Sequence, residues 1–310
     1  MTSARKGASD AMNWKAIAKN YELYLFLLPA LVYFLLFHYW PMYGLQIAFK
    51  DFLPSRGILD SPWAGFKHFS EFFDSYLFWQ LMRNTLELSL YSLAVGFPVP
   101  IVLALMMNEV RGARFKKTVQ TITYAPHFIS TVVIVSMIVF FLSPQTGLVG
   151  QIVAAFGKDP VPFLSSPAWF KTVYVLSGVW QHAGWSSIIY LAALAGIDPQ
   201  THEAAVIDGA SRFQRILHIN IPGIFPTIVI LLILDVGNLM AVGFEKVYLM
   251  QNPLNLDSSN IIATYVYKRG IQEAQYSFAA AVGLFNSAIN FILLLTVNRI
   301  ARGLKQNSLW

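Results

Sequence analysis

Residues 198–222 read Asp-Pro-Gln-Thr-His-Glu-Ala-Ala-Val-Ile-Asp-Gly-Ala-Ser-Arg-Phe-Gln-Arg-Ile-Leu-His-Ile-Asn-Ile-Pro and separate two strongly apolar stretches. Asp198 is a residue type that caps helix N-termini, and Pro199 then occupies the first helical position, where its missing N–H costs nothing. Gly209 suits the left-handed conformation that commonly ends a helix. The pattern therefore predicts a helix of about two turns over residues 200–208.

A second helix is predicted to follow directly. Ser211 and Gln214 have the Ser-x-x-Gln spacing of a capping box, in which each residue satisfies a free backbone N–H. Phe213 and Leu217 share one face of that helix. Pro222 is expected to limit it, because proline lacks the N–H that the next turn needs.

The first of these helices has an unusually smooth surface. Ala204 and Ala205 present almost no side chain, so another backbone could approach closely, and Glu203 and Asp208 flank this patch. One interpretation is an amphipathic elbow that packs on its own helix bundle. The other is a docking helix that occupies a groove in a partner and transmits force to the apolar stretches on either side.

The composition is that of a membrane protein. Of the 310 residues, 56% are apolar and 12% are charged, whereas soluble domains carry about 25% charged residues. The absence of cysteine excludes thiolate metal sites, disulfides and a cysteine nucleophile. The six histidines show no His-x-x-x-His or Glu-x-x-His spacing, so no metal site is expected.

Six apolar segments approach the length of about 20 residues that a membrane-spanning helix needs. They are residues 23–45, 85–107, 121–142, 172–195, 224–244 and 277–297. These predict an all-α integral membrane protein with six transmembrane helices, the first of them a retained helix and not a cleaved signal. We divide the chain into residues 1–80 (a polar lead, the first helix and an external loop), a five-helix core over 81–300 that includes the connector 198–222, and a tail over 301–310.

Basic residues set the expected orientation. With the N-terminus in the cytosol, the segments 1–22, 108–120, 196–222 and 298–310 are cytosolic and hold 13 of the 22 Lys and Arg residues. This interpretation places both termini and the connector on the cytosolic side. The net charge of +6 then reflects orientation and contact with lipid headgroups, and no nucleic-acid partner is expected.

The connector also resembles a known signature. Glu203-Ala204-Ala205, then Gly209, then Ile219-Asn220-Ile221-Pro222 is similar to the Glu-Ala-Ala motif of ATP-binding-cassette (ABC) importer permeases, with isoleucine at position 221 where leucine is usual. Residues 124–130, 242–247, 283–287 and 308–310 resemble the corresponding stretches of carbohydrate importers. The likeness covers nearly the whole chain and is closest to permeases of oligosaccharides and polysaccharide fragments.

This resemblance implies a type I importer fold of the maltose-importer kind in a bacterial inner membrane. It implies a second homologous permease as a heterodimer partner, two ATPase subunits that bind ATP and Mg²⁺, and an external sugar-binding protein, with no cofactor on this chain. The residues that it places against the ATPase are Glu203, Ala204, Ala205, Asp208, Gly209, Ala210 and Arg212. Glu203 and Arg212 would make polar contacts, the two alanines would enter the groove, and Gly209 would form the turn.

Several polar or aromatic side chains within the apolar segments are candidates for a sugar path, because sugars need hydrogen bonds and an aromatic surface. The candidates are Asp235, Asn238, Asn286, Asn290, Gln181 and Trp185. Asp235 and Asn238 are expected to share one helical face with Val242 and Glu245, and Asp235 departs from the uncharged residue expected there. The alternative for each is hydrogen bonding between helices. Glu87 is expected to reach the membrane interface.

Three other functions stay open from the sequence. Asp235 could carry a proton in a secondary transporter, although a single acidic residue deep in the membrane does not by itself form a chain of proton-transfer groups. A membrane hydrolase could use His127 or His182 with Asp235, but no Gly-x-Ser-x-Gly or His-Glu-x-x-His supplies the chemistry. A structural subunit is the third. The chain lacks the Gly-x-x-x-x-Gly-Lys-Ser/Thr motif, so in an ABC importer another polypeptide must hydrolyse ATP.

Overall fold

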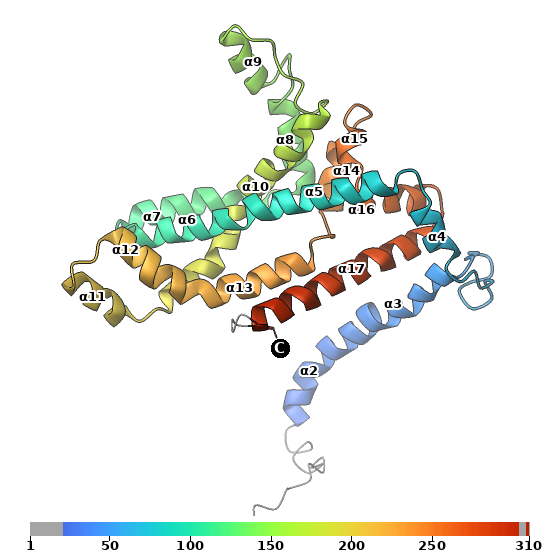
Figure 1. Cartoon of the computed structure of the whole chain (residues 1–310), viewed down its shortest axis with the longest axis horizontal. Helices are drawn as coiled ribbons and strands as arrows, with labels where there is room; N and C mark the ends of the chain where they lie inside the picture. Colours follow the sequence, from blue (N-terminus) through green and yellow to red (C-terminus); the bar gives the residue numbers. More distant parts are fainter. Residues whose placement is uncertain (1–20, 304–307, 310) are drawn as a thin grey trace, which may run out of the picture.

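The computed structural model describes residues 21–303 and 308–309, and these residues are almost entirely helical (Figure 1). Within this part of the chain the only β-type pairing is two isolated bridges, so the predicted all-α class is confirmed. Residues 1–20 of the predicted polar lead 1–22 and residues 304–307 and 310 of the predicted tail 301–310 lie outside the described residues.

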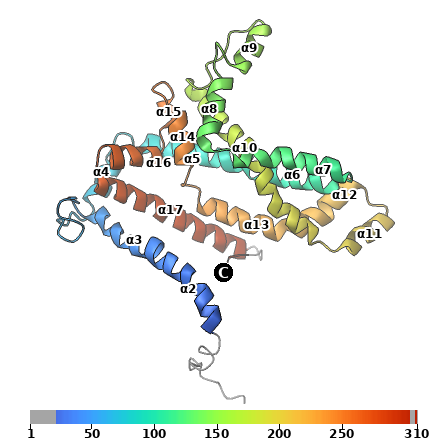
Figure 2. The same cartoon turned by 180° about the vertical axis from the view of Figure 1, so that it is seen from behind.

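The first membrane helix runs continuously over Tyr21–Phe49 and stands apart from the rest of the molecule. It consists of α2 (Tyr21–Phe34), the π turn η1 (Leu35–Tyr39), α3 (Trp40–Met42) and the 3-10 helix η2 (Tyr43–Phe49). No residue of α2 is buried, and Figures 1 and 2 both show α2 leaning away from the bundle. Only its end is anchored, because η2 packs against α17 (Tyr276–Gly303).

A short folded loop connects this helix to the core. Lys50 forms a β-bridge with Trp63, whose ring stacks on that of Phe49 with centroids 5.8 Å apart. Lys67 Nζ donates to Asp51 Oδ1 at 2.9 Å, and this hydrogen bond holds the pKa of the Asp51 carboxyl below its ordinary value. The loop ends in α4 (Lys67–Phe73), which packs on α17.

The core is built from tilted helices linked by short segments. Its first part comprises α5 (Phe78–Gly96), α6 (Pro98–Glu109), α7 (Ala113–Tyr124), η3 (Ala125–Phe128), α8 (Thr131–Phe141), α9 (Leu148–Ala155) and α10 (Pro167–Ala195). Its second part comprises α11 (Pro199–Ile207), α12 (Arg212–Arg215), the π turn η4 (Ile216–Asn220), α13 (Ile221–Gly237), α14 (Phe244–Met250), α15 (Leu256–Ser259), α16 (Ile262–Tyr267), the π turn η5 (Lys268–Gln272) and α17.

Four helices are long and apolar enough to cross a membrane, and one bent pair could form a fifth span. The four are Tyr21–Phe49, Phe78–Glu109, Arg212–Gly237 and Tyr276–Gly303. The predicted segment 121–142 corresponds to the pair Ala113–Phe128 and Thr131–Phe141, which meet at 102°. The 29-residue helix α10 covers the predicted segment 172–195 but is more polar, since it contains Gln181 and His182. The count of six therefore stays a prediction, whereas the multi-helix membrane architecture is confirmed.

Helix α10 lies at the centre of the core, packed against α5, α6, α7 and α13. It lies close to α7: a Cβ placed on Gly184 would lie 2.1 Å from the carbonyl oxygen of Thr123. Small residues allow membrane helices to pack this tightly. Two apolar clusters include buried residues of α10, one around Phe170 and the other around Leu194 and Ile224. A third, around Phe72, lies between α4, α5, α16 and α17.

Pro222 does not end the second connector helix, contrary to expectation. The helix continues without interruption over Arg212–Gly237. The π turn η4 precedes the proline by one residue, and the N–H of Ile221 bonds to the carbonyl of Ile216. This wider turn gives room for a ring that would otherwise collide with the preceding turn. The same arrangement occurs at η1, one residue before Pro41.

Candidate functional site

The connector helix α11 forms as its sequence predicts. Asp198 Oδ1 accepts from the N–H of Gln200 at 2.9 Å. At the other end Gly209 has a φ of +78°. The N–H of Ala210 bonds to the carbonyl of Ala205 at 2.8 Å, and that of Gly209 to the carbonyl of Val206 at 3.1 Å. This pair of bonds is a Schellman motif, so both ends of α11 are closed.

The predicted capping box is also present in α12. Ser211 Oγ accepts from the N–H of Gln214 at 3.3 Å, and Gln214 Oε1 accepts from the N–H of Ser211 at 2.7 Å. Two capped helix ends therefore meet at the Gly209 turn. The turn is held in one geometry because backbone groups are hydrogen-bonded on both sides of it, by the Schellman motif at the end of α11 and by the capping box at the start of α12.

Helix α11 is not buried against any part of the chain that the structure describes. None of its residues is buried, and Ile207 is 85% exposed. The predicted contact residues Glu203 and Arg212 are exposed, and their side chains form no ion pair with other described residues. Figure 1 shows α11 projecting from one end of the bundle. This arrangement argues against an elbow packed on its own bundle and leaves an apolar, uncovered surface.

Both ends of the connector are nevertheless fixed to the core. Ile197 precedes α11, and Ile216 and Ile221 follow α12; all three pack on the cluster around Leu194 and Ile224. The contact is close, because a Cβ on Gly223 would lie 2.6 Å from Ile197 Cδ1. A displacement of α11 would therefore be passed to α10 and α13 with little slack.

A cavity of about 670 Å³ lies further along the bundle, within the size range of small-molecule sites. It is lined by residues of α5, α6, α10 and α13 and by the segment between α13 and α14. Three predicted path residues line it, namely Asp235, Asn238 and Trp185. Serines 89, 92 and 186 and the tyrosines 174 and 190 add hydroxyl groups to the same wall.

The cavity coincides with a break in the predicted fifth span. The segment 224–244 was expected to be helical throughout, but α13 ends at Gly237 and α14 begins at Phe244. Asp235 therefore does not share a continuous helical face with Val242 and Glu245. Irregular backbone at membrane depth is tolerated where it lines a cavity or is satisfied by neighbouring protein, and both conditions hold here.

Asn286 and Asn290 supply the partners for that break. Asn290 Oδ1 accepts from the N–H of Met240 at 2.8 Å, and Asn286 Nδ2 donates to the carbonyl of Met240 at 3.2 Å. Neither residue is among those that line the cavity. Gln181 is placed similarly, since its Nε2 donates to the carbonyl of Ile129 at 3.1 Å beside the bend between α7 and α8. These three of the six predicted path residues thus hold irregular backbone.

Trp185 belongs to an aromatic group at the same bend. Its ring is stacked on His127, with centroids 4.6 Å apart and planes 1° from parallel. Phe128 meets Trp185 edge to face at 5.4 Å, and His127 Nδ1 lies 3.2 Å from His182 Nδ1. No described carboxylate contacts either histidine of this pair, so the acid–base group that a hydrolase would need does not assemble.

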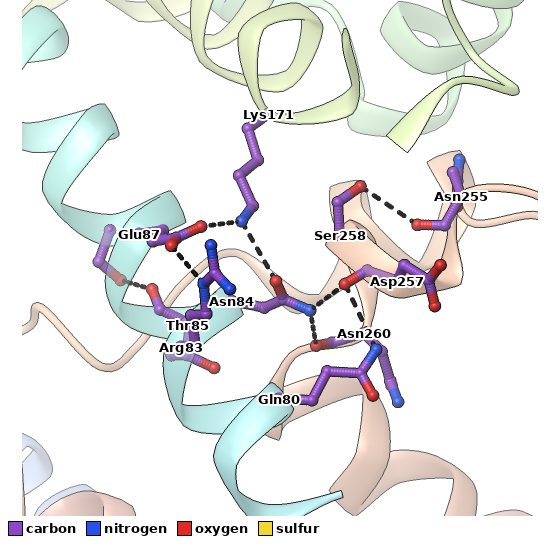
Figure 3. A network of polar contacts seen from close by, with 11 residues as sticks. Gln80, Arg83, Asn84, Thr85, Glu87, Lys171, Asn255, Asp257, Ser258 and Asn260 are labelled. Carbon is purple, nitrogen blue, oxygen red and sulfur yellow. Dashed lines mark hydrogen bonds and ion pairs between the residues drawn. The ribbon is translucent and has the colours of Figure 1, made fainter. Parts of the chain in front are cut away.

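A polar network closes the end of the core opposite α11 (Figure 3). Lys171 of α10 pairs with Glu87 of α5 and donates to Asn84 Oδ1 at 3.1 Å. Asn84 Nδ2 in turn donates to the carbonyls of Asp257 at 2.8 Å and Asn260 at 3.1 Å. Glu87 was expected to reach the membrane interface; its side chain is 44% exposed and is paired with Lys171 and Arg83.

Several residues of these sites have no distinctive signal in the sequence. Tyr174 and Tyr190 line the cavity but read as ordinary aromatic positions of an apolar helix. Lys246 belongs to the stretch 242–247 that resembles carbohydrate importers, and its side chain is buried. A lysine directly after a span looks like an interfacial anchor, and the helix break that draws it inward has no strong sequence signal apart from Gly237 and Gly243.

Comparisons with known proteins agree with this architecture. Residues 96–306 match the family described as binding-protein-dependent transport system inner membrane component. The chain is 47% identical over 288 residues to the polygalacturonan/rhamnogalacturonan transport system permease protein YteP of Bacillus subtilis (strain 168), an alignment that covers 93% of this chain and 89% of that protein.

Two solved structures are similar over nearly the whole chain. One belongs to a bacterial ABC transporter involved in the import of the acidic polysaccharide alginate, with a TM-score of 0.86, 44% identity, and coverage of 93% of this chain and 98% of that one. The other is a bacterial alginate ABC transporter in complex with an alginate pentasaccharide-bound periplasmic protein, with a TM-score of 0.88, 42% identity, and coverage of 96% and 99%.

Proposed function

This chain belongs to the family of binding-protein-dependent transport system inner membrane components, and from that membership we propose how its two sites divide the work of transport. It is a membrane-spanning permease subunit of an ABC importer for saccharides. Because its relatives are permease subunits, the activity that we assign is passage of a solute and not the breaking of a bond.

Helix α11 is proposed to be the contact with an ATPase subunit. The observation that supports this most directly is a helix that is capped at both ends, joined tightly to α10 and α13, and left uncovered by the other described residues. In this proposal Ala204 and Ala205 lie in a groove of the ATPase, and Glu203, Asp208 and Arg212 form its polar margin. Gly209 and Ala210 hold the turn. ATP and Mg²⁺ are bound by the ATPase.

The cavity beside the α13–α14 break is proposed to be part of the sugar path. Asp235 and Asn238 offer hydrogen-bonding groups there, and Trp185 offers an aromatic face. Broken membrane helices place polar backbone at the bilayer centre, which is where transporters commonly bind their solutes. The relatives named above are assigned to polysaccharides, so we propose that the solute is a fragment of a polysaccharide.

The complete importer is proposed to contain this chain, a second homologous permease, two ATPase subunits and an external sugar-binding protein. Both termini and α11 would face the cytosol of a bacterial cell. The exposed helix α2 would then lie against lipid or the second permease. Movement of α11 when the ATPases close would tilt α10 and α13 and open the cavity to alternate sides of the membrane.

The test replaces Gly209 with proline in the importer expressed with its neighbouring genes. Proline fixes φ near −65°, whereas Gly209 has a φ of +78°. The connector would therefore lose its turn, and we expect both co-purification of the ATPase and ATP-driven sugar uptake to fall about tenfold or more, which corresponds to roughly 1.4 kcal/mol of lost binding.

Gly157→Pro is the matched control. Gly157 also has a positive φ, of +69°, and open space around it, but it lies in the α9–α10 connection away from α11. We expect this variant to retain ATPase association. Unchanged uptake and association in Gly209→Pro would disprove the coupling role. Uptake by the purified chain alone, driven by a proton gradient without ATP, would instead establish a secondary transporter.

A further inference from the structure

Lys246 is a buried cation without an anionic partner. Its side chain lies in α14, and the residue is 8% exposed. Its Nζ donates to the carbonyl of Tyr174 at 3.1 Å and stands 5.0 Å from the centre of the Tyr174 ring. It forms no ion pair with any residue that the structure describes. A lysine ammonium has three N–H donors, so two of them have no protein acceptor here.

The ammonium faces empty space. Lys246 lines a side cavity of about 260 Å³ together with His182, Tyr174 and Ser186. Tyr174 and Ser186 also line the main cavity, so the two spaces adjoin. Asp235 lines only the main cavity.

Gly178 keeps the approach to the ammonium open. It lines the same side cavity, and a Cβ at this position would lie 3.5 Å from Lys246 Nζ. A larger side chain there would cover the charge. The sequence therefore leaves room beside Lys246 on the neighbouring helix.

Burying an unpaired charge is costly, and buried charges in membrane proteins therefore normally face a partner, a cavity or a solute. An anion that enters the side cavity would supply the partner that Lys246 lacks among the described residues. Carboxylates bind ammonium groups through short hydrogen bonds between charged groups. His182 can donate a further hydrogen bond, and the Ser186 hydroxyl another.

We propose that the side cavity binds the carboxylate of an acidic sugar unit during transport, with Lys246 as its principal donor. This inference rests on the proposed function and adds the charge of the solute to it: the preferred solute is an oligosaccharide that contains uronic acid. Tyr174 and Trp185 would present aromatic surface to the sugar rings in the adjoining cavity.

The experiment uses the complete importer in proteoliposomes, with trigalacturonate as the acidic probe and its carboxyl-reduced counterpart as the neutral one. We expect Lys246→Gln to lower the kcat/KM for trigalacturonate uptake by about tenfold to a hundredfold, the effect of one lost hydrogen bond between charged groups. Lys246→Arg keeps the charge and should retain most of the uptake. ATP hydrolysis without sugar, which reports assembly, should be the same in all three proteins.

A second measurement does not depend on delivery by the binding protein. A water-soluble carbodiimide joins a carboxylate to a lysine amine as an amide, and the carboxylate oxygen leaves in the urea product. With trigalacturonate present, we expect a sugar adduct on the peptide that contains Lys246, detected by mass spectrometry. Lys246→Arg cannot form this amide and is the control.

The outcomes separate the two claims. If the wild-type importer takes up trigalacturonate, but Lys246→Gln does so equally well and no adduct forms at Lys246, the carboxylate subsite is disproved. A loss of sugar-free ATP hydrolysis in Lys246→Gln, with no adduct in the wild type, would show a structural role and also overturn it. Uptake of the neutral sugar alone would refute the acidic solute and leave the proposed function standing. ATP-driven uptake of neither sugar would count against the proposed function itself.

Discussion

At the scale of single residues, Lys171 occupies the junction of three elements. Its Nζ contacts Glu87 and Asn84 of α5, and Asn84 continues to the carbonyls of Asp257 and Asn260 around α15 (Figure 3). The Lys171 side chain is 18% exposed, so its contacts are screened less than those of a surface pair. This residue therefore joins α10 to both neighbours at the end of the core away from α11.

Lys171→Met should loosen this end of the core. We expect the free energy of unfolding to fall by about 1–2 kcal/mol, since Glu87 is 44% exposed and can be partly solvated after the change. Hydrogen exchange of the backbone amides over residues 257–262 should accelerate accordingly.

Arg83→Met is the control for the Lys171 variant. Arg83 also pairs with Glu87, but its side chain is 77% exposed. Its removal should therefore lower the free energy of unfolding by less than about 1 kcal/mol. Equal exchange rates in both variants would mean that Lys171 does not secure the loop.

Individual residues of the connector were the most predictable part of the chain. Asp198, Gly209, Ser211 and Gln214 act through local backbone geometry, which a short sequence window contains in full. The path residues were harder. Asn286 and Asn290 look like solute ligands in the sequence, but their role depends on the Met240 backbone, which lies 50 residues from Asn290 and adopts a shape that local patterns do not indicate.

At the scale of elements, the crossing of α7 and α10 depends on one missing side chain. A Cβ at Gly184 would lie 2.1 Å from Thr123 O, so the two helices must separate if that position is filled. The crossing lies beside the bend between α7 and α8, which Gln181 holds through Ile129. Helix packing and the bend are thus set within the same two turns of α10.

Gly184→Ala is expected to destabilise the protein by about 1–3 kcal/mol, the usual cost of overpacking. Gly283→Ala is the matched control: it lies within α17 with nothing within 4 Å of the added carbon. There the better helix propensity of alanine should leave stability unchanged or raise it by up to about 1 kcal/mol. Thermal unfolding in detergent, followed by circular dichroism, compares the two. A melting temperature for Gly184→Ala at or above that of the wild type would contradict the close contact.

Element boundaries were predicted less well than the presence of helices. The length of the apolar segments located the long helices, but it could not place the break at residues 238–243 or the 102° bend. Both depend on side chains from other helices that satisfy the freed backbone, namely Asn290 and Gln181. At Pro222 the error was the reverse: the helix was expected to end there, but it continues because the preceding π turn makes room for the proline ring.

At the scale of the whole molecule, the chain offers a clean test of its orientation because it contains no cysteine. Ile207 in α11 is 85% exposed, and Tyr76 beside α5 is 91% exposed near the other end of the core. A single cysteine at either position should therefore be fully reactive unless a partner covers it.

We expect a membrane-impermeant maleimide added outside intact cells to label Tyr76→Cys and not Ile207→Cys. Inside-out vesicles should show the reverse pattern. Ile207→Cys should also become less reactive when the ATPase is co-expressed, because the proposed contact would cover it. External labelling of Ile207→Cys would place the connector on the wrong side of the membrane and remove the basis of the coupling proposal.

The overall architecture followed from composition and from the connector motif, since both are properties of long stretches and tolerate local error. The exact number of spans did not, because α10 is too polar and the α7–α8 pair too bent to register as plain apolar helices. Polar residues such as Gln181 and His182 serve the interior of the bundle. A hydropathy criterion cannot distinguish them from residues that end a span.

The π turn at Ile216–Asn220 has a further consequence for the direction in which α11 points. A π turn contains one residue more than the α-helix would need, so the chain holds a spare residue between the connector and α13. Deleting one residue there would restore an ordinary α-helical turn without breaking the helix. Because the π turn completes one rotation with one residue more than an α turn, this deletion would leave the angle of α11 about the helix axis nearly unchanged. A deletion in the regular α-helix that follows would instead rotate everything on the connector side by about 100°, the angle that one residue spans around a helix axis. The π turn thus lets the chain carry one additional residue before Pro222 without changing the angle at which α11 would meet the proposed ATPase partner.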